Sequence, residues 1–157
     1  MILDKAKKLA NKERKIKEDE HKKEKEEQRH KAKELSDQTN DLLAYLRKEL
    51  HNKGGFSVFD AKSVPHLHYP GDIAYLYKDK ELVGRFYCKW ESYQFRGSDE
   101  VPEETCWHIV MGFKEDGYRE PYLDNYRWNY DKYRTAFAAT NLEEFEESLA
   151  EFLKKYY

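Results

Sequence analysis

Glycine and proline are absent from the first fifty residues, and this absence constrains the fold more than any other feature of the sequence. From Ile2 to about His51 the dominant residues are Ala, Leu, Lys, Glu, Gln and Arg, which are all good helix formers. Acidic residues repeatedly stand four positions before basic ones, a spacing that supports a helix, as in Asp4/Lys8, Glu13/Lys17, Glu18/Lys22, Asp19/Lys23 and Glu27/Lys31. The pattern predicts one long helix that ends at Asn52-Lys53-Gly54-Gly55.

The predicted helix has two parts of different character. Residues 1–34 hold 13 Lys/Arg and 9 Asp/Glu but no aromatic residue, so this part has little with which to build a core. Residues 17–33 are polar on all sides, which is typical of a solvated helix. Farther on, an apolar stripe at helical spacing predicts docking onto the rest of the chain, through Leu35, Thr39, Leu42, Leu46 and Leu50. We therefore expect a charged helical arm over residues 1–34 and a compact α+β domain over residues 35–157.

After the glycines, apolar and polar residues alternate as they do in half-buried strands. We expect strands at residues 56–61, 72–78, 81–90, 105–113 and 133–139. The second and third of these form a hairpin around Asp79-Lys80. In the third strand one face is expected to carry Leu82, Gly84, Phe86, Cys88 and Trp90.

The C-terminal segment has the clearest helix pattern in the chain. Thr140 and Glu143 are predicted to form a capping box, in which each side chain satisfies a free backbone donor of the other residue. The apolar face that follows consists of Leu142, Phe145, Leu149, Phe152, Leu153 and Tyr156. The predicted fold class is α+β, with a long N-terminal helix, a small antiparallel sheet of about four to five strands and an amphipathic C-terminal helix packed on the sheet.

Composition argues against several classes of protein. No apolar run approaches the roughly 18 residues of a membrane span, and Met1-Ile2-Leu3-Asp4-Lys5 leads into no apolar signal-peptide core. Two cysteines, Cys88 and Cys106, are too few for the disulfide framework of a small secreted domain. These features predict a cytoplasmic protein with no membrane partner. The net charge is +4 for residues 1–34 and −6 for the remainder, unlike the basic stripe of a dedicated duplex-binding protein.

Catalytic and metal-binding patterns are weak. Alternating pairs supply four potential metal ligands, His66, His68, Cys106 and His108, but they lack a Cys-x-x-Cys or His-x-x-x-His spacing and suit loop or core roles equally well. A nuclease-like cluster of Asp60, Lys62 and Asp72 is expected by chance in a chain that is 38% charged. The chain has no phosphate-binding glycine loop and no nucleophile elbow. We therefore expect a protein that is not an enzyme and that uses no metal or cofactor.

The basic tip of the arm is the first segment expected to bind a partner. Its candidate binding residues are Lys7, Lys8, Lys12, Arg14 and Lys15. The basic tip has three other interpretations. It can bind phosphates with salt-sensitive affinity, or it can be a solvated helix end. It can also form a homodimer through the N-terminal helix, because apolar residues repeat every seven positions at Ile2, Leu9 and Ile16.

The tyrosine-rich segment 118–133 is the second segment expected to bind a partner. Its candidate binding residues are Tyr118, Tyr122, Tyr126, Arg127, Trp128 and Tyr130. Tyr, Trp and Arg are enriched at protein–protein hot spots, and they also stack on single-stranded bases. Packing within the core is a third interpretation. The tyrosine spacing suits a helix, whereas Asp124, Asn125 and Asn129 suit loops.

A short stretch near the C-terminus carries a local similarity to known proteins. It comprises Asp131-Lys132-Tyr133-Arg134 and then Ala139-Thr140-Asn141-Leu142-Glu143, which leads into the last helix. With a basic helical arm on an α+β body, the chain resembles small phage-encoded inhibitors of host defence, in particular anti-CRISPR proteins. The resemblance implies a stoichiometric inhibitor of a CRISPR effector nuclease, and it transfers no functional residue.

Taken together, the sequence predicts a non-enzymatic protein-binding module with a larger protein or ribonucleoprotein partner. The alternative is a nucleic-acid-associated protein, whose basic arm contacts phosphates while Tyr and Arg side chains stack on bases.

Overall fold

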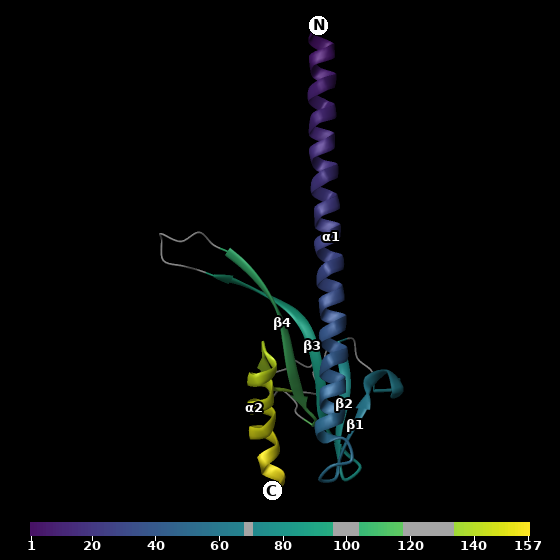
Figure 1. The fold of residues 1–157 in the computed structure, drawn as a ribbon, viewed down its shortest axis with the longest axis vertical. Coiled ribbons are helices and arrows are strands. Elements are labelled where there is room, and N and C mark those ends of the chain that lie inside the picture. Colours follow the sequence, from purple (N-terminus) through teal and green to yellow (C-terminus); the bar gives the residue numbers. More distant parts are fainter. Residues whose placement is uncertain (68–70, 96–103, 118–133) are drawn as a thin grey trace, which may run out of the picture. The chain divides into compact units, whose positions relative to one another are not determined.

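In the computed structural model, which describes residues 1–67, 71–95, 104–117 and 134–157, one uninterrupted helix, α1, spans Ile2–Leu50 (Figure 1). By its internal contacts the chain divides into two units, Met1–Asp37 and Gln38–Tyr157. Apart from Met1, the first unit consists of α1 residues. The division falls three residues after the boundary expected at residue 34. Within the described ranges, no helix is long and apolar enough to cross a membrane.

Helix α1 ends where the sequence predicts. The amide of His51 still donates to the carbonyl of Arg47, at 3.1 Å, but Asn52 then adopts a left-handed conformation with φ of 59°. Its amide donates to the carbonyl of Phe56 at 2.9 Å, and Gly54 also has a positive φ. Asparagine and glycine tolerate this conformation, which turns the chain out of the helix and into the first strand.

Five antiparallel strands follow one another in a single sheet of order β1-β2-β3-β4-β5. They are β1 Phe56–Asp60, β2 Asp72–Lys78, β3 Glu81–Phe95, β4 Glu104–Glu115 and β5 Arg134–Ala139. A short 3-10 helix, η1, at Ala61–Ser63 follows β1. The turn between β2 and β3 places both Asp79 and Lys80 at positive φ, 50° and 71°, as a two-residue hairpin of the primed type requires. The predicted α+β fold is confirmed.

Strands β3 and β4 are longer than the sequence pattern indicated. Their register runs from Gly84 opposite Glu115 to Phe95 opposite Glu104. By contrast, β2 pairs with β3 only as far as Tyr87, and β5 pairs with β4 only as far as Met111. Beyond those points β3 and β4 pair only with each other among the described strands.

One face of the sheet packs against both helices. The second half of α1 contributes the buried Leu42 and Leu46, and the amide of Gln38 donates to the sulfur of Met111 on β4 at 3.2 Å. Burial, reinforced by the carboxylates of Glu146 and Glu49, raises the pKa of the Tyr45 hydroxyl. Leu42 and Leu46 of the predicted apolar stripe are thus buried within the second unit, as expected.

The C-terminal helix α2, Leu142–Leu153, closes this face with phenylalanines and is followed by a 3-10 turn, η2, at Lys154–Tyr156. Phe145 lies 6.0 Å from Phe86 and 5.3 Å from Phe137 between ring centroids, and Phe152 lies 4.7 Å from Phe113. Such tilted and edge-on contacts are favoured between aromatic rings. In Figure 1, α2 is the yellow helix beside the sheet.

The predicted cap of α2 is wrong by one residue. The N-cap is Asn141, whose side-chain oxygen accepts a hydrogen bond from the amide of Glu144 at 2.8 Å. Thr140 lies one position before it, so Thr140 and Glu143 do not form the expected capping box. Asn is among the strongest N-cap residues, and here it caps in preference to the preceding threonine.

The other face of the sheet contains a buried ion pair that sequence patterns did not indicate. Arg85 on β3 is only 2% exposed and donates through Nη1 to Oδ2 of Asp72 on β2 at 3.0 Å. Its guanidinium carbon lies 5.1 Å from the centroid of the Tyr75 ring, a favourable cation–π geometry. Both faces of the central strands are therefore buried, one by apolar packing and one around this pair.

Candidate interaction surface

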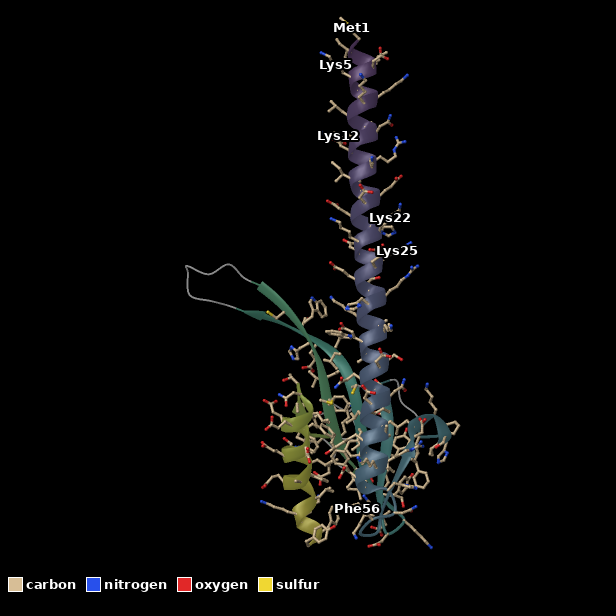
Figure 2. All side chains as sticks on the ribbon, in the orientation of Figure 1. Met1, Lys5, Lys12, Lys22, Lys25 and Phe56 are labelled. Atoms are coloured by element: carbon tan, nitrogen blue, oxygen red, sulfur yellow. The ribbon has the colours of Figure 1, made fainter. Side chains whose placement is uncertain are left out.

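Most of the arm is exposed along its whole circumference. Every residue from 1 to 30 is exposed, and Figure 2 shows the labelled side chains of Lys5, Lys12, Lys22 and Lys25 projecting outward from the helix axis. His30 and Glu34 form an ion pair of 2.7 Å across one helical turn. The helix is thus maintained by good helix formers and local charge pairs rather than by a core.

The basic residues of the tip do not form one patch. Lys5, Lys8, Lys12 and Lys15 follow one another at intervals of three and four residues, so they lie along one face of the helix; we call them the lysine face. Lys7 and Arg14 are seven residues apart and lie on another side, because each residue advances about 100° around an α-helix. The structure therefore groups Lys8, Lys12 and Lys15 of the predicted set and separates Lys7 and Arg14 from them.

An exposed apolar ridge runs beside the lysine face. Its members Ile2, Leu9 and Ile16 are 84%, 62% and 49% exposed. Large aliphatic side chains at regular spacing on an otherwise polar helix are typical of a contact surface. Because Lys5 and Lys12 are only three or four residues from Leu9, their aliphatic stems lie next to the ridge while their ammonium groups extend beyond it.

The second predicted binding segment lies outside the described residues. This applies to all six of its candidates, Tyr118, Tyr122, Tyr126, Arg127, Trp128 and Tyr130. Of the two candidate surfaces, the arm is the one that lies within the described residues.

The weak metal and nuclease patterns gain no support from the described residues. His66 is exposed in the segment after η1, Cys106 and His108 alternate on β4, and His68 lies outside the described ranges. In the parts of the chain that are described, no three metal-ligating side chains come together. Asp60 instead caps η1, accepting from the amide of Lys62 at 3.0 Å, and Asp72 belongs to the buried pair with Arg85.

Sequence reasoning missed one exposed aromatic residue. Trp107 on β4 is 53% exposed and lies opposite Ser92 on β3, in the part where these two strands extend beyond β2 and β5. By strand alternation Trp107 shares a face with Ile109, Met111 and Phe113, of which Met111 and Phe113 are fully buried. The registers that end at Tyr87 and Met111 explain the difference, because no further described strand continues the sheet beyond them.

Comparisons of this chain with protein-family models, with curated proteins and with solved structures gave no match.

Proposed function

We propose that this protein is a non-enzymatic binding module that binds a larger partner protein through its helical arm. The observation that carries the proposal is the exposed helix of residues 1–30, on which the lysine face lies beside the apolar ridge. Apolar side chains favour burial against a partner, whereas lysines at the rim contribute to specificity and to the rate of encounter. A protein surface with an apolar groove and acidic edges has the chemistry to match both features.

Paired variants of the full-length chain test this proposal. Leu9→Asp with Ile16→Asp removes the ridge, and Lys8→Glu with Lys15→Glu reverses the lysine face. Lys7→Glu with Arg14→Glu makes the same charge change on another side of the helix and serves as the control. Affinity purification from nuclease-treated lysate should recover a stoichiometric protein with the wild type and the control but not with the other two. Equal recovery with all four proteins would exclude the arm as the contact surface.

A narrower form of the proposal is that the partner is a CRISPR effector nuclease in the cytoplasm of the host. It is supported by the resemblance to anti-CRISPR proteins and is compatible with the two free cysteines, Cys88 and Cys106. Titration of the chain against purified effector nucleases should abolish DNA cleavage at a one-to-one ratio. Unchanged cleavage in the presence of excess chain would remove this class of partner and leave the wider proposal in place.

The second candidate function is nucleic-acid association, which is supported by the lysine face. Four lysines on one side of a helix can neutralise phosphates, and binding then weakens steeply with salt. The apolar ridge has no role in such contacts, which is why we rank this function second. Gel shifts with single-stranded RNA and duplex DNA should show binding that Lys8→Glu with Lys15→Glu abolishes; binding that the reversal leaves intact would exclude phosphate contacts through the arm.

A further inference from the structure

Two rows of opposite charge run the length of the arm. The basic row contains Lys8, Lys15, Lys22 and Arg29, and the acidic row contains Glu13, Glu20, Glu27 and Glu34, each with a residue at every seventh position. Residues seven apart lie on nearly the same side of a helix. Each row is therefore a continuous stripe of one charge.

The two rows do not pair within one helix. Side chains interact along a helix at separations of three or four residues, but each acidic-row residue stands five positions after a basic-row residue. Five residues correspond to about 140° around the helix, on well-separated sides. Members of each row pair locally with other residues, as in Glu13/Lys17 and Glu18/Lys22, but the two rows do not pair with each other within one helix.

An offset of five is the spacing at which two parallel helices exchange ion pairs. In a two-stranded coiled coil the residues that flank the seam form salt bridges between chains. With two arms parallel and in register, the flanking contacts are Lys8–Glu13, Lys15–Glu20, Lys22–Glu27 and Arg29–Glu34, and all of them are attractive. Antiparallel arms would instead place each row opposite a row of the same charge.

The apolar ridge occupies the first part of the seam between the rows. Ile2, Leu9 and Ile16 lie at the first seam position of three successive heptads, and Lys23 and His30 hold that position in the next two. The other seam position holds Lys5 and Lys12, which have long stems, and then Asp19 and Glu26, each of which meets its own copy across the seam. Like charges there oppose association, so the flanking rows must provide much of the attraction and the pairing is weak and salt-sensitive.

We propose that the arms of two copies of this chain pair in parallel and in register through these rows. The proposal goes beyond partner binding, because a pair of arms presents the contact surface twice and gives avidity for a partner with two sites. It does not require the partner to exist, so its test is separate from that of the proposed function.

A charge exchange between the rows tests the proposal by sedimentation equilibrium of the full-length chain over a wide range of concentration. Over residues 8–27, Lys8→Glu, Lys15→Glu and Lys22→Glu make both rows acidic, and Glu13→Lys, Glu20→Lys and Glu27→Lys make both rows basic. Each triple variant alone should lose about a hundred-fold or more in association constant, the sum of several weak ion pairs. A mixture of the two triple variants restores attraction on both sides and should form heterodimers.

Lys7→Glu, Arg14→Glu and Lys25→Glu provide the matched control, because these positions lie away from both rows and the seam. This variant should dimerise like the wild type, and circular dichroism should show the same helix content in all proteins. Lys5→Leu with Lys12→Leu makes the seam apolar from Ile2 to Ile16 and should strengthen association. A monomeric wild type at every concentration, no heterodimer in the mixture, or equal loss in the control would overturn the proposal.

Discussion

At the scale of single residues, the buried ion pair of Arg85 and Asp72 predicts a large loss of stability when either residue is substituted. The two side chains are 2% and 4% exposed and are joined at 3.0 Å. Removing one member of a buried ion pair costs about 3–5 kcal/mol, because the remaining charge stays buried and loses this interaction. We expect Asp72→Ala to lower the free energy of unfolding by that amount in urea denaturation. Asp72→Leu combined with Arg85→Met should recover most of the loss, and a double variant as unstable as the single one would contradict the argument.

The Cys88 thiol gives the domain a dependence on alkaline pH. Burial raises its pKa to about 11, against a smaller lowering by the hydrogen bond from Thr39, whereas a thiol in the unfolded chain titrates near 8.5. The folded state therefore favours the neutral thiol. This stabilising contribution is complete below pH 8.5 and is lost as the pH rises through about 11.

Comparison with Cys88→Ala isolates this effect, because other alkaline groups titrate in both proteins. Between pH 8 and pH 11 the wild type should lose about 2–3 kcal/mol more of its free energy of unfolding than the variant. The measurement is urea denaturation at several pH values under reducing conditions. Parallel curves for the two proteins would show that the thiol ionises alike in the folded and unfolded states.

At the scale of elements, the start of α2 distinguishes two neighbouring polar residues. Asn141 accepts from the amide of Glu144, and Thr140 lies outside the helix. Asn141→Ala should therefore cost about 1 kcal/mol of stability, the usual value of an N-cap, while Thr140→Ala should cost only a few tenths. Chemical denaturation of both variants measures the difference. A larger loss for Thr140→Ala would restore the capping box that the sequence alone suggested.

Sequence patterns predicted the positions of the secondary-structure elements but not the lengths or the burial of all their parts. Alternation located all five strands and the hairpin at Asp79-Lys80, because the side-chain period of a strand is visible in one sequence. Strand length was not visible, because the extension of β3 to Phe95 depends on where neighbouring strands stop. The burial of Arg85 was not visible either, since it depends on the register that brings Asp72 near it. The exposure of Trp107 was not visible for a similar reason, because it depends on where the neighbouring strands end.

At the scale of the whole molecule, the sequence separates the two units by composition before any contact is known. The absence of aromatic residues before Tyr45 places the hydrophobic core after the arm. The candidate surface on the arm could be predicted in part, because an isolated helix has a geometry fixed by its period. That period divides the basic residues into the lysine face and the side that bears Lys7 and Arg14. The same period places the acidic row and the basic row on two different sides of the helix. Their complementarity becomes visible only when the heptads of two copies are aligned.

Deletion of residues 1–34 tests whether the second unit depends on the arm for its stability. Residues 1–30 bury nothing, whereas the apolar residues of α1 that fill the core, Leu42 and Leu46, remain in the shortened chain. The free energy of unfolding and its dependence on urea should therefore change little, by about 0.5 kcal/mol or less. In circular dichroism the helical signal should fall strongly, and the arm of the intact chain should melt gradually and separately. Deletion through residue 43 is the matched control: it removes Leu42 and should lower the stability by several kcal/mol. A large loss from the shorter deletion would mean that the arm stabilises the domain.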